Sequence, residues 1–180
     1  DKNAWLPELA TKKFRSGAAE SKPHAVRDGA KTPGKVAIYS TCYINYNEPG
    51  IGHDLLKVLD HNEVPYVLVS KEQCCGMPKL ELGDLDSVNA SKEANIPVLA
   101  RYAKEGYAIV SAVPSCTLMF KQELPLMYPD DAEVQLVKQA MWDPFEYLMQ
   151  RKREGLLKTE FPQPLGKISY QIPCHGRVQN

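Results

Sequence analysis

The stretch Lys35-Val36-Ala37-Ile38-Tyr39-Ser40-Thr41-Cys42 shows the pattern that repeats along the chain: a short apolar run ends in polar residues that lead into a cysteine. Apolar runs of this length between turn-forming residues are typical of buried strands. Residues 66–69, 107–113 and 168–172 have the same character. We therefore expect four buried strands, each followed by one or more cysteines.

The segments between these runs have the periodicity of helices. Ile51, Leu55, Leu56 and Leu59 share one helical face, and apolar residues recur four apart within residues 94–105. Strands that alternate with helices pair in parallel through right-handed crossovers. The chain is thus predicted to be an α/β protein with a parallel, doubly wound sheet.

The cysteines share one position in this predicted fold, the loops at the C-terminal edge of the strands. Cys42 follows the first strand, Cys74 and Cys75 follow the second, Cys116 the third and Cys174 the fourth. Because parallel strands deliver the loops after them to one crevice, we expect these residues to converge. Five cysteines in 180 residues are too few, and an odd number, for a disulfide scaffold.

The residue types leave several interpretations of the thiols open. A single cysteine is most often a small buried hydrophobe. Structural zinc uses pairs of cysteines with two to four residues between them, and this sequence has no such pair. A redox pair or a nucleophilic cysteine near His175 is a third interpretation, and an iron–sulfur cluster held by separate loops is a fourth. The tripeptide Cys74-Cys75-Gly76 favours the cluster, because adjacent cysteines can contact different irons and Gly76 permits a close turn.

Composition restricts the other function classes. The 22 basic and 22 acidic residues balance, so no overall field favours nucleic acid as a partner. The longest largely apolar stretch, residues 107–114, is far shorter than the roughly 20 residues of a membrane-spanning helix. No secretory signal pattern is present in the sequence. We expect a cytoplasmic protein with no transmembrane segment of its own.

The cysteine motifs resemble a known family. Cys42, Cys74-Cys75-Gly76, Pro114-Ser115-Cys116 and Pro173-Cys174-His175, in this order, resemble the CCG cysteine-rich domain family, to which the B subunits of heterodisulfide reductases belong. Residues 42–47, 54–59 and 70–76 are most similar to the C subunits of anaerobic glycerol-3-phosphate dehydrogenases within that group. The resemblance covers about residues 35–180. It departs from a full copy of the motif at Met119, where a further cysteine would stand and where we expect core packing instead.

The resemblance implies a domain organisation. Residues 1–34 are expected to be a linker or wrapping arm, with Trp5, Leu6 and Leu9 as anchors. Residues 35–172 correspond to a first CCG-type α/β domain, and residues 173–180 to the start of a second copy. The chain is therefore expected to be a fragment of a longer protein.

The resemblance also implies a function, that of an iron–sulfur electron-transfer subunit of a multi-subunit oxidoreductase in anaerobic respiration. Its partners would be a flavoprotein dehydrogenase, other iron–sulfur subunits and a quinone, with peripheral contact at the inner face of the membrane. One cluster, expected to be [4Fe–4S], would be held by Cys42, Cys74, Cys75 and Cys116, with Cys174 as a further metal ligand. Two alternatives are a catalytic subunit that reduces disulfides and a cluster-free binding domain in which the cysteines have a purely packing or regulatory role.

Overall fold

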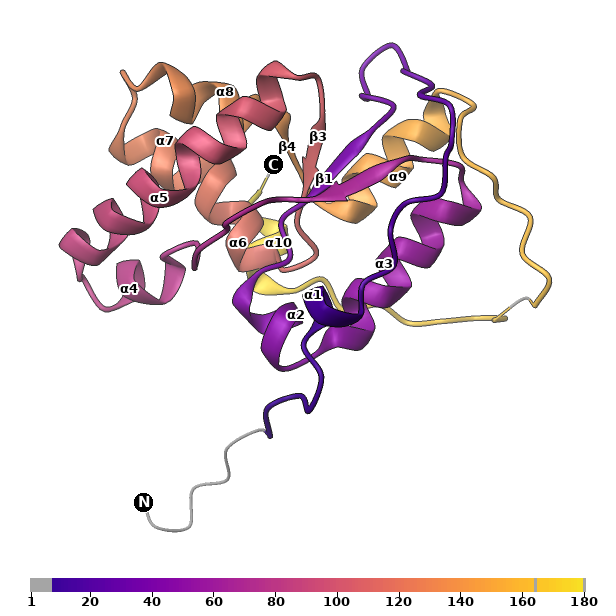
Figure 1. Ribbon diagram of the computed structural model, residues 1–180, viewed down its shortest axis with the longest axis horizontal. Coiled ribbons are helices and arrows are strands. Elements are labelled where there is room, and N and C mark those ends of the chain that lie inside the picture. Colours follow the sequence, from indigo (N-terminus) through magenta and orange to yellow (C-terminus); the bar gives the residue numbers. More distant parts are fainter. Residues whose placement is uncertain (1–7, 164, 180) are drawn as a thin grey trace.

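A parallel sheet of four strands runs through the centre of the part of the chain that the structure describes (Figure 1). This computed structural model describes residues 8–163 and 165–179. The strands are β1 (Val36–Ile38), β2 (Tyr66–Leu68), β3 (Ala108–Val110) and β4 (Met141–Trp142), and they lie in the order β2-β1-β3-β4. The predicted α/β fold with a parallel sheet is confirmed.

Helices fill the connections between the strands and also precede β1 and follow β4 along the chain. They are α1 (Phe14–Gly17), α2 (Cys42–Tyr46), α3 (Pro49–His61), α4 (Met77–Glu81), α5 (Leu85–Lys104), α6 (Pro114–Leu118), a π-helical turn η1 (Met119–Glu123), α7 (Leu124–Met127), α8 (Ala132–Ala140), α9 (Pro144–Arg153) and α10 (Cys174–Arg177). Among the described residues, no helix combines the length and the apolar character that crossing a bilayer requires.

Both faces of the sheet are covered by helices. Val36 and Ile38 of β1 belong to one apolar cluster and Ala37 to another, because successive side chains of a strand point to opposite faces. Helix α3 supplies Leu59 to the first cluster, and α5 supplies Leu99 to the second. In Figure 1, α3 and α9 lie on one side of the sheet and α5 and α8 on the other. The sheet is therefore doubly wound, as predicted.

The fourth strand is not the predicted one. Residues 168–172 form no strand, and Ile168 and Tyr170 are 73% and 63% exposed. The neighbour of β3 is β4 instead, with Ile109 paired to Met141. An apolar run becomes a strand only where a neighbouring strand can pair with it, and β4 already occupies this edge. The prediction that Cys174 follows a strand was therefore wrong.

The direction of winding reverses between β1 and β3. The connection from β1 to β2 passes through α3 on one face, whereas the connection from β2 to β3 passes through α5 on the other. β1 and β3 are direct neighbours, with Ala37 paired to Ile109. In open α/β sheets such a reversal leaves a crevice beyond the carboxyl ends of the strands. The loops that follow β1 and β3 border this crevice.

The N-terminal arm, residues 8–34, lies against the domain. Phe14 in α1 is fully buried in the apolar cluster beneath α3, and its ring centroid lies 5.2 Å from that of His53. Leu9 is 71% exposed, so Phe14 anchors the arm in its place. Trp5 and Leu6 lie outside the described residues.

We predict that Gly52→Ala destabilises the protein, although alanine has the higher helix propensity. A Cβ at Gly52 would lie 2.6 Å from the Phe14 ring and 2.9 Å from Cγ2 of Ile44. Overpacking a filled site costs about 1–3 kcal/mol, which outweighs the gain of up to about 1 kcal/mol from replacing a helical glycine. Urea unfolding should show a net loss of about 1–2 kcal/mol. The matched control is Gly50→Ala in the same helix, where no atom lies within 4 Å of the new Cβ. Equal stability of the two variants would contradict the packing of α1 on α3.

Candidate functional site

Three loops at the C-terminal edge of the sheet carry the first four cysteines. Cys42 begins α2 at the end of the β1 loop (residues 39–42), and Cys74 and Cys75 lie in the β2 loop (residues 69–76). Cys116 lies in α6, directly after β3. These loops meet at the crevice where the winding reverses.

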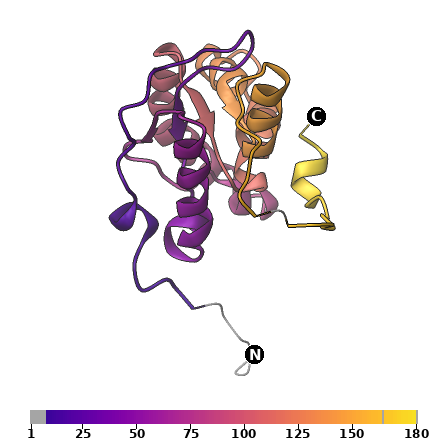
Figure 2. The same ribbon diagram turned by 90° about the vertical axis from the view of Figure 1, so that its right-hand side faces the viewer.

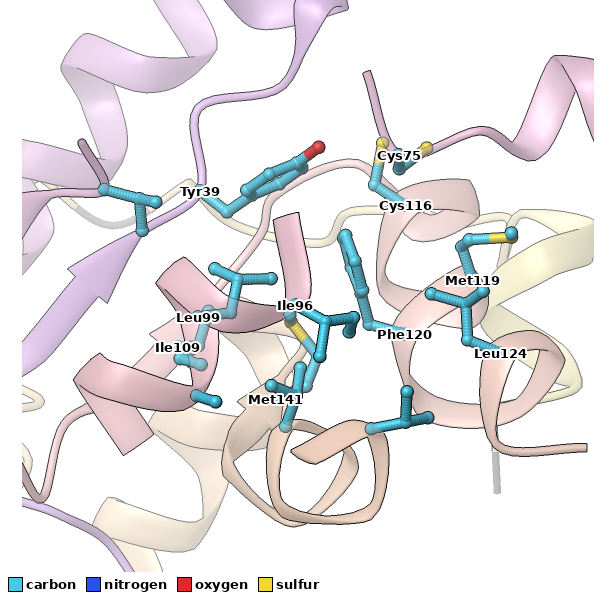
Figure 3. Packing of buried hydrophobic residues seen from close by; sticks show 14 of the residues in the cluster. Tyr39, Cys75, Ile96, Leu99, Ile109, Cys116, Met119, Phe120, Leu124 and Met141 are labelled. Carbon is cyan, nitrogen blue, oxygen red and sulfur yellow. The ribbon is translucent and has the colours of Figure 1, made fainter. Parts of the chain in front are cut away.

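The four thiols form a row in which each is hydrogen-bonded to the next. Cys42 contacts Cys74, Cys74 contacts Cys75, and Cys75 contacts Cys116. The first two cysteines are exposed and the last two are buried, and Figure 3 shows the buried pair within the apolar core. Within residues 8–163 and 165–179, no three His, Cys, Asp or Glu side chains are placed so as to hold one metal ion. The donors are thus arranged as a row that leads from solvent into the core.

Contacts within the row favour protonated thiols. Hydrogen bonding to Cys116, together with burial, raises the pKa of Cys75 to about 12. Hydrogen bonding to Cys75 and burial also raise the pKa of Cys74, and burial followed by the nearby Cys74 raises the pKa of Cys42. A negative charge on one of these sulfurs is unfavourable because its neighbours are other thiols and apolar groups.

Backbone N–H groups partly oppose this effect. The N–H groups of Tyr43, Gly76 and Met77 donate to the sulfurs of Cys42, Cys74 and Cys75, respectively. Each of these bonds lowers the pKa of the thiol that accepts it, because it favours the charged form. The loops therefore already present hydrogen-bond donors to three of the sulfurs.

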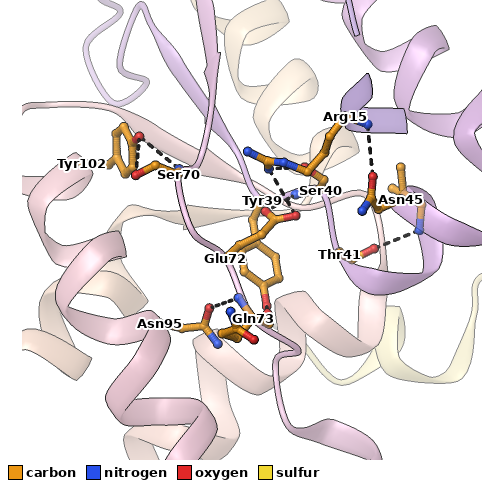
Figure 4. Close-up of polar contacts among 11 residues, drawn as sticks. Arg15, Tyr39, Ser40, Thr41, Asn45, Ser70, Glu72, Gln73, Asn95 and Tyr102 are labelled. Carbon is orange, nitrogen blue, oxygen red and sulfur yellow. Dashed lines mark hydrogen bonds and ion pairs between the residues drawn. The ribbon is translucent and has the colours of Figure 1, made fainter. Parts of the chain in front are cut away.

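A buried asparagine fixes the β2 loop. Asn95 of α5 is only 1% exposed; its Oδ1 accepts the Gln73 N–H at 2.9 Å, and its Nδ2 donates to the Cys74 carbonyl at 3.0 Å. Figure 4 shows Asn95 beside Gln73. Gly76 then turns the chain with φ of +93°, and a Cβ there would lie 3.3 Å from Cβ of Ser91. Glycine adopts this backbone conformation at little cost, so the turn and the amide together orient the adjacent cysteines.

Tyr39 packs against the buried end of the row. Its side chain is fully buried, its hydroxyl donates to the Gln73 carbonyl, and its ring meets Phe120 edge-on at 5.1 Å between centroids. Burial, with added repulsion from Cys75 and Cys116, raises the pKa of Tyr39 well above its ordinary value. Figure 3 shows the hydroxyl end of Tyr39 directed toward these two cysteines. The phenol remains a neutral hydrogen-bond donor.

Cys174 and Met119 do not extend the row. Cys174 is exposed at the start of α10, which packs against α6, and it takes no part in the thiol contacts described above. The segment that leads to α10 runs along the outside of the domain (Figure 2). Met119 is fully buried in the apolar cluster, in agreement with the expected core packing. The structure thus brings together four of the five predicted cysteines.

A polar cluster that sequence reasoning missed borders the exposed end of the row. Arg15 Nη1 donates to Ser40 Oγ at 3.0 Å and lies 3.3 Å from Glu72 Oε1. Beside it is a pocket of about 350 Å³, lined in part by Cys42 and Cys74. Arg15 and Ser40 belong to no motif, and Glu72, although it lies in the family-like stretch 70–76, belongs to no pattern that indicates an ion pair. Asn95, which holds the β2 loop and was also missed, did leave a signal, because it is a polar residue on the packed face of a helix.

We predict that iodoacetamide modifies Cys174 at least about tenfold faster than Cys75 in metal-free protein at pH 8. Only the thiolate reacts, and with a pKa of about 12 for Cys75 the ionised fraction is about one part in 10⁴ at this pH. The rate at Cys75 should rise with pH until its raised pKa is reached. Mass spectrometry of the tryptic peptides measures both rates. Labelling of Cys75 as fast as Cys174 in the folded protein would contradict the row of contacts.

The chain is similar to components of known oxidoreductases. It is 28% identical over 168 residues to the C subunit of the anaerobic glycerol-3-phosphate dehydrogenase of Escherichia coli (strain K12). This match covers 90% of this chain and 38% of that protein. It is 28% identical over 148 residues to the B subunit of the fumarate reductase (CoM/CoB) of Methanothermobacter marburgensis, covering 81% of this chain and 27% of that protein. An uncharacterized iron-sulfur protein of Methanocaldococcus jannaschii is 24% identical over 144 residues, and this match covers 79% of this chain and 26% of that protein. The chain thus spans well under half the length of these relatives.

A family model gives the most direct assignment. The model described as a cysteine-rich domain, CCG, matches residues 36–121, the segment that holds all four thiols of the row. No solved structure gives a match to the chain. Residues 36–121 of the chain therefore match the CCG cysteine-rich domain family.

Proposed function

We propose that the chain is an iron–sulfur electron-transfer subunit in which Cys42, Cys74, Cys75 and Cys116 hold one cluster of the [4Fe–4S] type. The observation that carries this proposal is the row of four thiols at the reversal between β1 and β3, inside the CCG domain. Thiolates from separate loops are the usual ligands of such clusters.

The donor set fits a group with several metal ions better than one ion. Neighbouring residues such as Cys74 and Cys75 do not readily surround a single tetrahedral ion, but their sulfurs can reach different irons. Metal coordination also removes the thiol proton and reverses the local pKa preference. The close contacts that disfavour thiolates in the metal-free chain would then become contacts with a positively charged centre.

Residues of the chain prepare the thiolates for this role. The N–H groups of Tyr43, Gly76 and Met77 donate to the sulfurs, and such bonds tune the reduction potential of a cluster. Tyr39 and the apolar cluster around Cys116 exclude water from the buried end. A bound cluster supplies a site that accepts and releases single electrons.

We further propose that electrons enter from a flavoprotein dehydrogenase and leave to a quinone or a further cluster, at the cytoplasmic side of the membrane. The names of two relatives support this proposal, because one is part of a dehydrogenase and the other part of a reductase. Other parts of the complex would supply the flavin and the acceptor site.

Residues 173–180 fit the start of a second CCG-type copy. Helix α10 begins at Cys174 as α2 begins at Cys42, so both cysteines occupy the first helical position. Cys174 lies outside the row, and in this proposal it serves a second metal site rather than the first.

Anaerobic reconstitution with iron and sulfide should give a brown protein with about four irons per chain. Replacing Cys42, Cys74, Cys75 or Cys116 singly with serine should remove most of the iron and of the visible absorption, because a hydroxyl is a poor substitute for a soft thiolate. Iron analysis and electron paramagnetic resonance (EPR) of the reduced protein measure the outcome.

The matched control is Cys174→Ser, which should retain the iron of the wild type. A colourless wild-type protein would contradict the cluster, and equal iron loss in Cys174→Ser would contradict the ligand assignment. Turnover of a disulfide substrate by the reconstituted chain would instead support the catalytic alternative.

A further inference from the structure

An ion pair between the N-terminal arm and the β2 loop lies beside the exposed end of the thiol row. We propose that Arg15 and Glu72 are positioning residues that hold the β1 loop against the β2 loop, and so keep Cys42 next to Cys74. The consequence for cluster binding rests on the proposed function, whereas the loop contact itself is tested separately below.

Arg15 joins three segments of the chain. Its backbone N–H donates to Oδ1 of Asn45 in α2 at 3.0 Å. Its Nη1 donates to Oγ of Ser40 in the β1 loop at 3.0 Å and lies 3.3 Å from Oε1 of Glu72 in the β2 loop. Figure 4 shows the guanidinium between these two loops. One side chain of the arm thus connects the elements that carry the exposed cysteines.

Glu72 has both carboxylate oxygens engaged. Its side chain is 10% exposed, its Oε2 accepts the Ser40 N–H at 2.8 Å, and its Oε1 faces Arg15. A largely buried carboxylate is costly unless it is paired and hydrogen-bonded. Removing Arg15 would leave Glu72 without its counter-charge, and removing the charge of Glu72 would weaken the hold on Ser40.

The backbone of both loops is strained next to this ion pair. Thr41 has φ of 66° and ψ of 157°, and Lys71 has φ of 54°. Positive φ is disfavoured for residues with a Cβ, and it persists where surrounding contacts enforce it. Thr41 directly follows Ser40, and Lys71 directly precedes Glu72. The contacts of the ion pair are therefore made by the immediate neighbours of the two residues with positive φ, one in each loop.

The apolar core cannot replace the ion pair of Arg15 with Glu72, because the core packs only around the buried end of the row. Cys75 and Cys116 are 3% and 5% exposed within the apolar cluster. Cys42 and Cys74 are exposed beside a pocket of about 350 Å³ that Arg15 also lines. Apolar packing positions Cys75 and Cys116. Polar contacts must therefore position Cys42 and Cys74.

Dibromobimane, which alkylates two neighbouring thiols with loss of two bromides, tests the contact in the metal-free chain. The wild type should give a cross-link between the tryptic peptides that contain Cys42 and Cys74. Arg15→Gln and Glu72→Gln should slow this cross-link about fivefold or more, and Arg15→Lys, which keeps the charge, should restore part of the rate. The matched control is Arg27→Gln, which breaks an ion pair between the same arm and Glu63 (3.4 Å) and should cross-link as the wild type does.

A second measurement uses reconstituted protein. Arg15→Gln should lose iron to a chelator about fivefold faster than Arg27→Gln and should have an altered EPR spectrum, with both variants compared under conditions in which circular dichroism shows them fully folded. Wild-type cross-linking rates in both Arg15→Gln and Glu72→Gln, or no cross-link in the wild type, would overturn the positioning role. A wild type that cross-links as expected but takes up no iron would overturn the proposed function and leave the positioning role standing.

Discussion

The rest of the structure depends on β1 having a parallel neighbour on each side. β1 is three residues long and fully buried, and it pairs in parallel with both β2 and β3. Because the three strands run in one direction, the loops after them end at one edge of the sheet. Cys42, Cys74 and Cys116 become neighbours for this reason, although no local motif joins them. An antiparallel strand in any of these positions would place its cysteine at the opposite edge.

Local stability and chemistry conflict at the row of thiols. In the metal-free chain, the pKa of Cys75 is raised to about 12, since the thiol is hydrogen-bonded to the Cys116 thiol and is also buried. An apolar side chain would suit a position that is 3% exposed without needing hydrogen-bond partners. Proteins accept such conflicts mainly where function requires them. Asn95 and the turn at Gly76 also support a functional role for the site, because a buried amide and a left-handed turn orient the cysteines rather than fill the core.

Sequence reasoning succeeded where the signal was local. The apolar runs of β1, β2 and β3, combined with the general rule for parallel sheets, were enough to bring four cysteines to one edge. The prediction of a strand at residues 168–172 failed because an apolar run does not reveal whether a partner strand is available. Met141–Trp142 pairs with β3 instead. The pair of Arg15 and Glu72 was missed for a related reason. A charged residue in a polar segment looks the same whether it is solvated or paired with a residue far along the chain.

The two ends of the row differ in a way that bears on electron transfer. Tyr39 and Phe120 close the buried end, where low polarity strengthens electrostatic interactions. The other end opens to the pocket beside Arg15 and Lys71. Under the proposed function, a partner approaches a cluster most closely at this open end. The chain has no net formal charge, so local charges there, rather than an overall field, would orient the partner.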